Sequence, residues 1–399
     1  MIDSPSNPAM AQTGTLFQPV FSGLLASLVG FASSFAIILQ GFDAVGATQA
    51  QAASGLFALC LGMALVGIIM SAMTKMPISI AWSTPGAALL IATGAVQGGF
   101  PAAVGAFIVA AALVVVAGFW RPFGRAVAAI PMPLASAMLA GILFNLCLAP
   151  VRAVAELPAL ALPIILVWAI TLRFARIWAV PAAVGVSAVM IAISTELPAD
   201  LFANAWPALV LVVPTLNLDA LVGIALPLFV VTMASQNIPG LAVLRTNGYH
   251  PDVKPIFVST GIVSAIGGLL GGQLINLAAI TAALCAGPEA HPDKAKRYIA
   301  AITAGFAYIV FALGAGIAAA FISAAPPILI EAVAGLALIG ALANALVGSV
   351  ADDDLRLPAI LTFVTAASGL TLFGIGAAFW GLIAGGALHA LLKTKKAAI

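Results

Sequence analysis

The fold of this chain is decided by residues 76–90, which read MPISIAWSTPGAALL. Residues 78–82 include β-branched side chains that favour an extended backbone, and the residue before a proline avoids the helical region. Ser83 or Thr84 followed by Pro85 is an N-cap followed by proline at the first helical position. The stretch therefore predicts a helix that begins near Pro85, in the middle of an apolar segment rather than at its edge.

The surrounding chain is unusually apolar. Of its 399 residues, 63% are hydrophobic and 7% are charged, whereas a soluble domain carries roughly 25% charged residues. This composition excludes soluble enzymes, nucleic-acid-binding proteins and disordered proteins. Because the apolar runs are continuous for about 20 residues, an outer-membrane β-barrel is excluded too. The composition indicates an all-α polytopic membrane protein.

Apolar runs of about 20 residues, within which glycine and proline are tolerated, predict fourteen transmembrane spans. The first seven lie at 17–40, 50–73, 78–97, 101–119, 130–149, 158–173 and 177–195. The second seven lie at 219–243, 255–271, 274–287, 296–322, 327–348, 357–371 and 373–392. The third and tenth are short and interrupted, so we expect them to be discontinuous.

The distribution of basic residues predicts the orientation. With the N-terminus in the cytoplasm, 14 of the 15 Lys and Arg residues fall in cytoplasmic loops and tails, and only Arg152 falls outside. Cytoplasmic loops of membrane proteins are enriched in Lys and Arg. We therefore expect both termini to be cytoplasmic.

The two halves of the chain resemble each other at an offset of 195 or 194 residues, which pairs span n with span n+7. The matches are 162–166 with 357–361, 87–89 with 282–284, and Pro133 plus 140–141 with Pro327 plus 334–335. Because seven spans is an odd number, two such copies are inserted with opposite topology. Inverted repeats are typical of transporters whose substrate site lies near the midplane. Chance similarity in a chain rich in Ala and Leu is the alternative.

The tenth span repeats the design of the third from the other side. Residues 271–281 read GGQLINLAAIT, in which Asn276 is the candidate cap of a second half-helix. Two half-helices that enter from opposite faces bring their N-termini together, and such termini attract anions. The alternative is that the breaks only kink the helices.

Polar side chains inside the spans complete a candidate binding site. The densest polar cluster lies in span 8, and it consists of Thr232, Ser235, Gln236 and Asn237, just before an expected break of the helix at Pro239. Ser34 and Gln40 lie in span 1. Isolated polar side chains also serve to hold helices together, which is the alternative for the serine. The candidate substrate-binding residues are Ser34, Gln40, Ser83, Thr84, Pro85, Gly86, Gln236, Asn237, Asn276, Leu277, Ala278, Ile280 and Thr281.

Two acidic residues are candidates for proton coupling. Glu331 lies inside span 12 and Asp43 near the end of span 1, and ionisable groups in the membrane are functional candidates. The alternatives are that Glu331 faces a gating interface and that Asp43 only marks the periplasmic surface. The sequence has no Walker A, HExxH or Ser/His/Asp pattern that would support ATP-driven or hydrolytic chemistry. Residues 289–293 read as a loop beside basic anchors rather than a metal site. We expect no metal, no cofactor and no enzymatic activity.

Five segments resemble the benzoate:proton symporter family of the BenE type. They are 81–90, 233–240, 276–283, 287–293 and 374–382. The resemblance implies uptake of benzoate with a proton across a bacterial inner membrane, with no nucleic-acid partner. It also implies the seven-plus-seven inverted-repeat fold shared with nucleobase transporters.

That fold has a core domain from spans 1–4 and 8–11 and a gate domain from spans 5–7 and 12–14. Applied to this chain, the resemblance divides it into a tail at 1–16, core at 17–120, gate at 121–200, core at 201–322, and gate with the cytoplasmic tail at 323–399. Glycine- and alanine-rich helix faces suit packing within and between subunits, so a homodimer is possible.

The sequence departs from the nucleobase relatives at the site. Those relatives resemble each other in having acidic residues on spans 8 and 10, where this chain has Gln236, Asn237 and Asn276. We therefore expect a symporter that holds a carboxylate between 83–86 and 276–281 and works by alternating access. A symporter for another small carboxylate or a nucleobase-like compound, and a channel-like anion conductor, are the alternatives.

Overall fold

The computed structural model describes residues 16–120, 131–195, 206–372 and 375–396, which are mostly helical. Residues 1–15 of the predicted tail, together with Arg121 and Arg125, lie outside the described residues. The helices of the first half are α1 (Phe17–Ala32), α2 (Phe35–Ala44), α3 (Gln49–Thr74), α4 (Thr84–Thr93), α5 (Gly99–Phe119), α7 (Met132–Cys147), α8 (Ala149–Glu156), α9 (Pro158–Phe174), the 3-10 turn η1 (Arg176–Trp178) and α10 (Ala179–Ser194).

The second half has a similar series of helices and most of the short strands. Its helices are α11 (Leu218–Ala220), the π-helical η2 (Leu221–Ala225), α12 (Leu226–Thr232), the π-helical η3 (Met233–Asn237), α13 (Ile238–Thr246), α14 (Val253–Gly268), α15 (Ile280–Ala286), the 3-10 turn η4 (Lys294–Lys296), α16 (Tyr298–Leu313), α17 (Ala315–Ala324), α18 (Pro327–Ser349), α19 (Arg356–Ala367) and α20 (Ala377–Lys396). The strands are β1 (Ile80–Trp82), β2 (Ile275–Leu277), β3 (Thr371–Leu372) and β4 (Ile375–Gly376).

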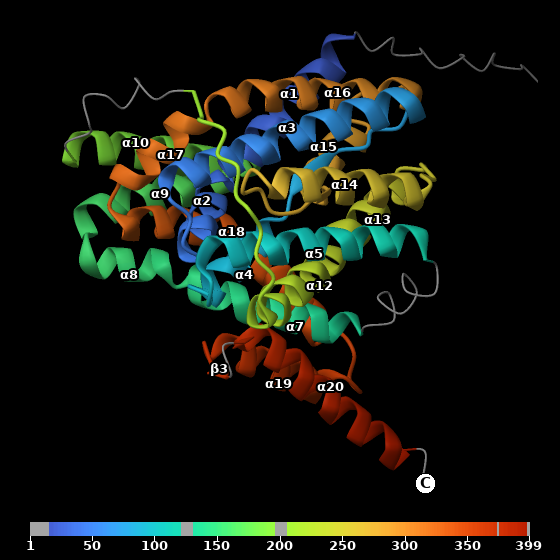
Figure 1. Cartoon of the computed structure of the whole chain (residues 1–399). Coiled ribbons are helices and arrows are strands. Elements are labelled where there is room, and N and C mark those ends of the chain that lie inside the picture. Colours follow the sequence, from blue (N-terminus) through green and yellow to red (C-terminus); the bar gives the residue numbers. More distant parts are fainter. Residues whose placement is uncertain (1–15, 121–130, 196–205, 373–374, 397–399) are drawn as a thin grey trace, which may run out of the picture.

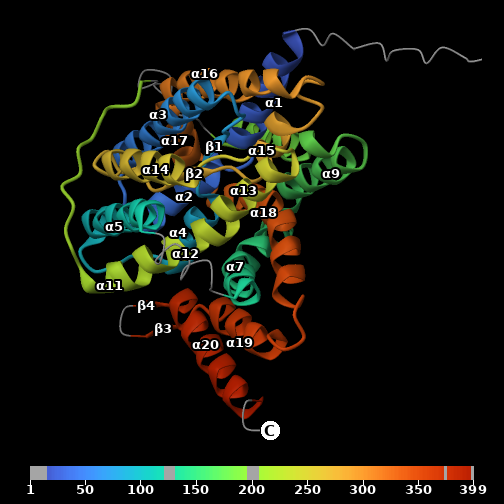
Figure 2. The ribbon, with the colours of Figure 1, turned by 90° about the vertical axis from the view of Figure 1, so that its right-hand side faces the viewer.

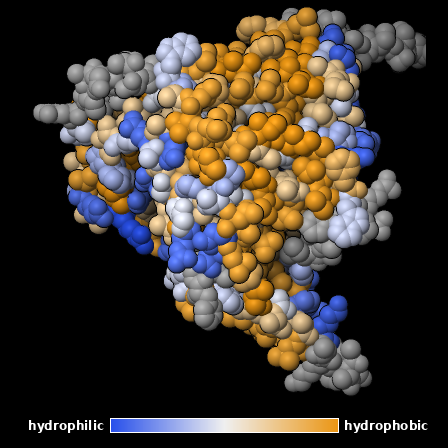
Figure 3. Space-filling view, viewed as in Figure 1, coloured by the Kyte–Doolittle hydropathy of each residue, from blue (hydrophilic) through white to orange (hydrophobic). Residues whose placement is uncertain are grey.

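The helices are those of a multi-pass membrane protein. In the described ranges, eight helical segments are long and apolar enough to cross a bilayer, and six further apolar helices are shorter. The surface carries a broad hydrophobic area, which Figure 3 shows over much of one face. The count of fourteen spans stays a prediction.

A two-stranded antiparallel pairing lies at the centre of the molecule. β1 pairs with β2, with Ala81 opposite Asn276. The backbone N–H of Ser83 extends the pairing by donating to Leu274 O at 3.0 Å, and that of Ala278 donates to Ser79 O at 3.0 Å. Figure 2 shows both strands enclosed by helices. The pairing gives hydrogen-bond partners to the N–H and C=O groups of extended backbone that water cannot reach. We call this region, from residues 79–86 and 273–281, the strand crossing.

The two strands occupy equivalent places in the two halves of the chain. β2 begins at Ile275 and β1 at Ile80, an offset of 275 − 80 = 195 residues. The helix contacts follow the same relation, since α14 packs against α5 while α16 packs against α3 (Figure 1). Similarly, α12 packs against α4 and α1 packs against α15. The predicted repeat thus relates elements that pack in corresponding pairs.

The predicted first span consists of two helices, because α1 ends at Ala32 and α2 begins at Phe35. The Ser34 hydroxyl donates to Gly30 O at 2.9 Å and accepts a hydrogen bond from Trp82 Nε1 at 2.8 Å. A serine that bonds back to the preceding turn often bends a helix. The interruption of the first span therefore lies beside β1.

Candidate substrate site at the strand crossing

Ser83 is the N-cap of α4. Its hydroxyl oxygen accepts from the backbone N–H of Gly86 at 3.1 Å and lies 2.6 Å from the Thr232 hydroxyl. α4 starts at Thr84, with Pro85 in its first turn, as the sequence predicts. Ser83 is fully buried and has both of these partners. The main role of its hydroxyl is therefore structural, because it holds α4 against α12.

Asn276 is not the N-cap of the second half-helix, and the prediction of this role is wrong. Asn276 lies in β2, whereas α15 begins at Ile280 after Ala279, without a side-chain cap. The side-chain N–H of Asn276 donates to Leu277 O at 2.8 Å. The extended conformation is set by pairing with β1, a long-range contact that local capping preferences do not contain. Thr281, in the first turn of α15, lies 3.1 Å from the Ser79 hydroxyl.

Gln236 and Asn237 lie in η3, one of two π-helical turns of a continuous helix from Leu218 to Thr246. The predicted break at Pro239 is therefore absent. Pro239 has no backbone N–H to donate within the helix. The π-helical turn just before it already shifts the helical hydrogen bonds by one residue, so the helix continues past the proline. Such π turns occur frequently at functional sites.

Asn237 ties this helix to the crossing. Its side-chain oxygen accepts a hydrogen bond from the backbone N–H of Leu277 at 3.0 Å. The approach is close, because a Cβ on Gly240 would lie 2.7 Å from Ala278 O. Gln236 is half-buried. The structure thus brings Asn237, Leu277 and Ala278 together, as the candidate site requires.

Gln273 belongs to the same region and was missed as a candidate from sequence. Its side-chain N–H donates to the backbone oxygen of Ser83 at 2.9 Å, so it connects the start of β2 with the cap of α4. A Cβ on Gly86 would lie 2.7 Å from Gln273 Oε1. The sequence feature that could have identified Gln273 is its position as a polar residue directly after Gly271 and Gly272, inside an apolar run.

Two acceptors at the crossing have no hydrogen-bond partner. They are Gln273 Oε1 and Asn276 Oδ1, both buried, and Gln40 Oε1 outside the crossing shares this property. Buried polar groups are almost always paired in native proteins, and each exception needs an explanation. A bound ligand that donates hydrogen bonds to these two oxygens would explain the exceptions at the crossing.

The remaining candidates line two cavities away from the crossing. Gln40 and Asp43 line a cavity of about 240 Å³ between α2, α3, α17 and α18. Glu331 and Arg152 line another of about 240 Å³, which also contacts the end of α4. Gln40 therefore does not share the surroundings of the other substrate-binding candidates, whereas Ser34 reaches the crossing through Trp82.

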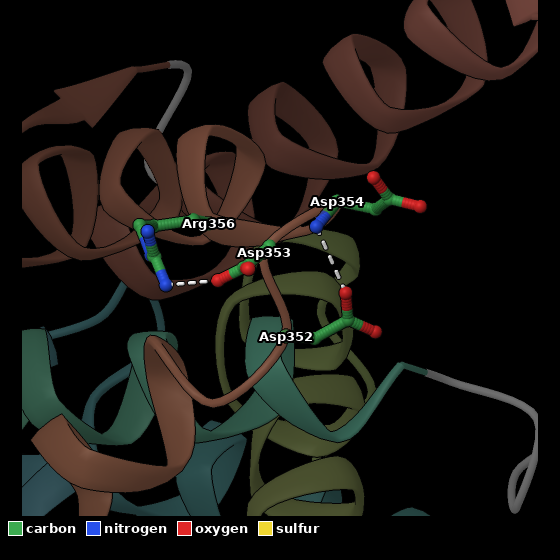
Figure 4. Close-up of polar contacts among 4 residues, drawn as sticks. All are labelled: Asp352, Asp353, Asp354 and Arg356. Carbon is green, nitrogen blue, oxygen red and sulfur yellow. Dashed lines mark hydrogen bonds and ion pairs between the residues drawn. The ribbon is translucent and has the colours of Figure 1, made fainter.

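The acidic and histidine-containing loops have local roles. Asp353 pairs with Arg356, and Asp352 Oδ1 accepts from Asp354 N at 2.9 Å, which shapes the turn before α19 (Figure 4). Arg297 donates to the backbone oxygens of His291 and Ala286. Within the described ranges, no three His, Cys, Asp or Glu residues are grouped so that they could hold a metal ion.

The fold defines the class of protein, a multi-pass helical membrane protein. The transmembrane domain of the cyanobacterial bicarbonate transporter BicA has a similar structure, with a TM-score of 0.58 and 16% identity over 93% of this chain and 97% of that chain. The murine Slc26a9 anion transporter, in its inward-facing state, gives a TM-score of 0.60 and 13% identity over 96% of this chain and 69% of that one. These similarities show the fold.

The sequence profile of the benzoate membrane transport protein family (BenE) matches residues 15–391. The chain belongs to this family, as the resemblance predicts. It is 39% identical to the inner membrane protein YdcO of Escherichia coli K12, over 94% of this chain and 95% of that protein. It is 33% identical to the benzoate membrane transport protein of Acinetobacter baylyi, with the same coverage. The protein is therefore a membrane transport protein and not an enzyme.

Proposed function

We propose that this protein imports benzoate together with a proton across a bacterial inner membrane by alternating access. Membership of the benzoate transport family, together with the pairing of β1 with β2, carries the proposal. The pairing joins two interrupted segments from opposite halves of the chain at one buried place. Transporters of the inverted-repeat type bind their substrates where such segments meet.

The proposed fold has fourteen spans in two inverted repeats of seven, with spans 3 and 10 discontinuous. The offset of 195 residues between β1 and β2 and the corresponding helix contacts support the repeat. In the proposed orientation both termini are cytoplasmic.

The proposed core and gate domains meet along α18. The cavity that contains Glu331 is lined by α4, assigned to the core, and by α7, α8 and α18, assigned to the gate. The cavity that contains Asp43 is lined by α2, α3 and α17 on the core side and again by α18 on the gate side. Open space along this boundary is what two domains need if one moves past the other.

The proposed substrate site is the strand crossing with η3. Ser83–Gly86, Gln236, Asn237, Asn276–Ala278, Ile280 and Thr281 form it, with Ser34 contributing through Trp82. Gln273 is added because it contacts the backbone of Ser83. Simultaneous replacement Ser83→Ala and Asn276→Ala is expected to weaken uptake, and an unchanged benzoate affinity would contradict this placement.

Charge explains why a proton would accompany benzoate. Moving one anion inward against an inside-negative potential costs about 2.3 kcal/mol per 100 mV. One co-transported proton cancels that charge. Three groups could carry the proton: the carboxyl groups of Glu331 and Asp43, and the carboxyl group of the substrate.

Uptake of labelled benzoate into liposomes that contain the purified protein tests the proposal. We expect accumulation that saturates, requires an inward proton gradient and collapses with a protonophore. Uptake equal to that of empty liposomes would reject benzoate and call for other small carboxylates and nucleobase-like compounds. Large unitary currents would favour an anion channel.

A further inference from the structure

Two buried side-chain oxygens at the strand crossing lack a hydrogen-bond donor. Gln273 and Asn276 are 1% and 0% exposed, and the side-chain oxygen of each has no hydrogen-bond partner. The two residues lie three positions apart, at and just before β2, beside the segment that begins α4.

The orientation of both side-chain amides is fixed by their other ends. Gln273 Nε2 donates to Ser83 O at 2.9 Å, and Asn276 Nδ2 donates to Leu277 O at 2.8 Å. Rotating either amide by half a turn would place its oxygen against a carbonyl oxygen, and neither atom could donate. The atom left without a partner is therefore an oxygen in both cases.

The hydroxyl groups nearby pair with one another. The hydroxyls of Ser83 and Thr232 lie 2.6 Å apart, and those of Ser79 and Thr281 lie 3.1 Å apart. One proton of each pair makes the bond between the two oxygens, so each pair keeps a second O–H, and the Ser83 oxygen also accepts from the Gly86 N–H. These hydroxyls can donate to the carbonyl oxygen of a ligand, but none of them is bonded to Gln273 Oε1 or Asn276 Oδ1.

The charged side chains on the described elements around the crossing are exposed. The elements packed against β2 are β1, α3, α14 and η3. Their titratable side chains are Cys60, which is buried, and Lys254, which is exposed in the first turn of α14 above the Phe119 ring. α15 itself has Cys285, and the elements packed against α15 and α4 add Arg245 on α13, Tyr298 and Tyr308 on α16, Asp43 on α2 and Cys147 on α7, of which Arg245 and Asp43 are charged and exposed.

An ionised carboxylate only accepts hydrogen bonds, so two buried acceptors would repel it, and burial without a counter-charge is costly. A protonated carboxyl group has an O–H that can donate to one of these oxygens. We infer that the strand crossing binds the substrate as the neutral carboxylic acid, so that the transported proton travels on the carboxyl group of the substrate. This inference rests on the proposed function.

The proton balance is simple. A carboxylate oxygen takes up one proton from the outer water, and the same O–H bond dissociates on the cytoplasmic side, where the carboxylate is released. The proton gradient drives the cycle because the concentration of the neutral carboxylic acid is higher on the side with the lower pH.

A ligand series on the unaltered protein tests the inference without any risk of misfolding. Binding of benzoate, benzamide and methyl benzoate is measured by calorimetry across pH 5.5 to 8. Benzamide keeps an N–H donor without an ionisable proton, whereas methyl benzoate has no donor. We expect the apparent benzoate affinity to fall about tenfold for each pH unit above the ligand's own pKa. Benzamide should bind independently of pH, and methyl benzoate should not bind.

Proton uptake and variants supply the second measurement. In weakly buffered solution near neutral pH, each benzoate that binds should take up about one proton. Replacement Asn276→Leu should weaken benzoate and benzamide to a similar extent, whereas the control Asn247→Leu, beyond α13, should change neither.

Two results would overturn the inference while leaving benzoate transport intact. One is a benzoate affinity that stays constant with pH, with benzamide unable to bind. The other is proton uptake that disappears in Glu331→Gln or Asp43→Asn, because the proton would then belong to the protein. A protein that binds and transports no benzoate at all would reject the proposed function itself, and the inference with it.

Discussion

The side-chain oxygen of Asn237 accepts a hydrogen bond from the backbone N–H of Leu277 at 3.0 Å, between residues 40 positions apart in the chain. Both residues are fully buried. The contact joins η3 to β2, so an amide expected to bind substrate also completes the hydrogen bonding of a short strand. In a membrane interior, a backbone N–H without such a partner has no water to replace it.

Replacing Asn237 by Leu should destabilise the protein, because the N–H of Leu277 would be buried without an acceptor. The expected loss is about 1–3 kcal/mol in the free energy of unfolding, seen as a lower melting temperature of the purified protein. The neighbouring replacement Gln236→Leu is the control and should change the melting temperature less. Equal melting temperatures for both variants would contradict the structural role of Asn237.

The hydroxyls of Ser83 and Thr232 should be energetically coupled, since they lie 2.6 Å apart. Replacement Ser83→Ala removes both this bond and the cap of α4, which is expected to cost about 1 kcal/mol or more. In a double-mutant cycle with Thr232→Val, the two effects should not add, because each single change already breaks the shared bond. Additive changes in thermal stability would show that the hydroxyls act independently.

Gly240 should not tolerate a side chain. A Cβ there would lie 2.7 Å from Ala278 O and 2.9 Å from Leu277 Cβ, so Gly240→Ala should push α13 away from β2 and reduce benzoate uptake strongly. The matched control is Gly185→Ala in α10, where a Cβ would meet no atom within 4 Å. That variant should retain uptake. Loss of uptake in both would indicate that helical glycines matter here for another reason.

Arg152 should assist the approach of benzoate as an anion, before the carboxylate takes up its proton, because Arg152 lines the cavity that also contains Glu331. Arg152→Gln is expected to raise the benzoate concentration for half-maximal uptake by about twofold to fivefold, the range of an exposed charge interaction. Glu331→Gln should act in the opposite direction, because it removes an acidic side chain from the same cavity. Raising the salt concentration should shrink both effects.

Arg173→Gln is the control for the entry measurement, since Arg173 is exposed at the end of α9 and does not line the cavity. Uptake kinetics are compared for the three variants at two salt concentrations. An unchanged half-saturation concentration in Arg152→Gln would remove this residue from the entry path.

Much of the fold could be predicted from local patterns. The start of α4 follows from Ser83 and Pro85, which favour a helix end wherever they occur. The apolar composition defines a multi-pass helical membrane protein, and the five segments that resemble the BenE family are sufficient to indicate it. These features depend on neighbouring residues or on sums over the whole chain.

The predictions that failed concern long-range contacts. Asn276 looks like a helix cap in isolation, but pairing with residue 81 keeps it in a strand. Pro239 looks like a break, but the π turn before it allows the helix to continue. Local preferences amount to a kcal/mol or less per residue, so a few tertiary hydrogen bonds in a dry interior outweigh them.

The sequence by itself determined that this is a multi-pass transporter of the benzoate family, and where α4 begins. Only the tertiary structure decided which polar groups at the crossing are already paired. Ser83 and Asn237 have partners inside the protein, whereas the oxygens of Gln273 and Asn276 remain open. The physical reason is that residue type fixes what a side chain can donate or accept, while its neighbours in space determine what remains for a ligand.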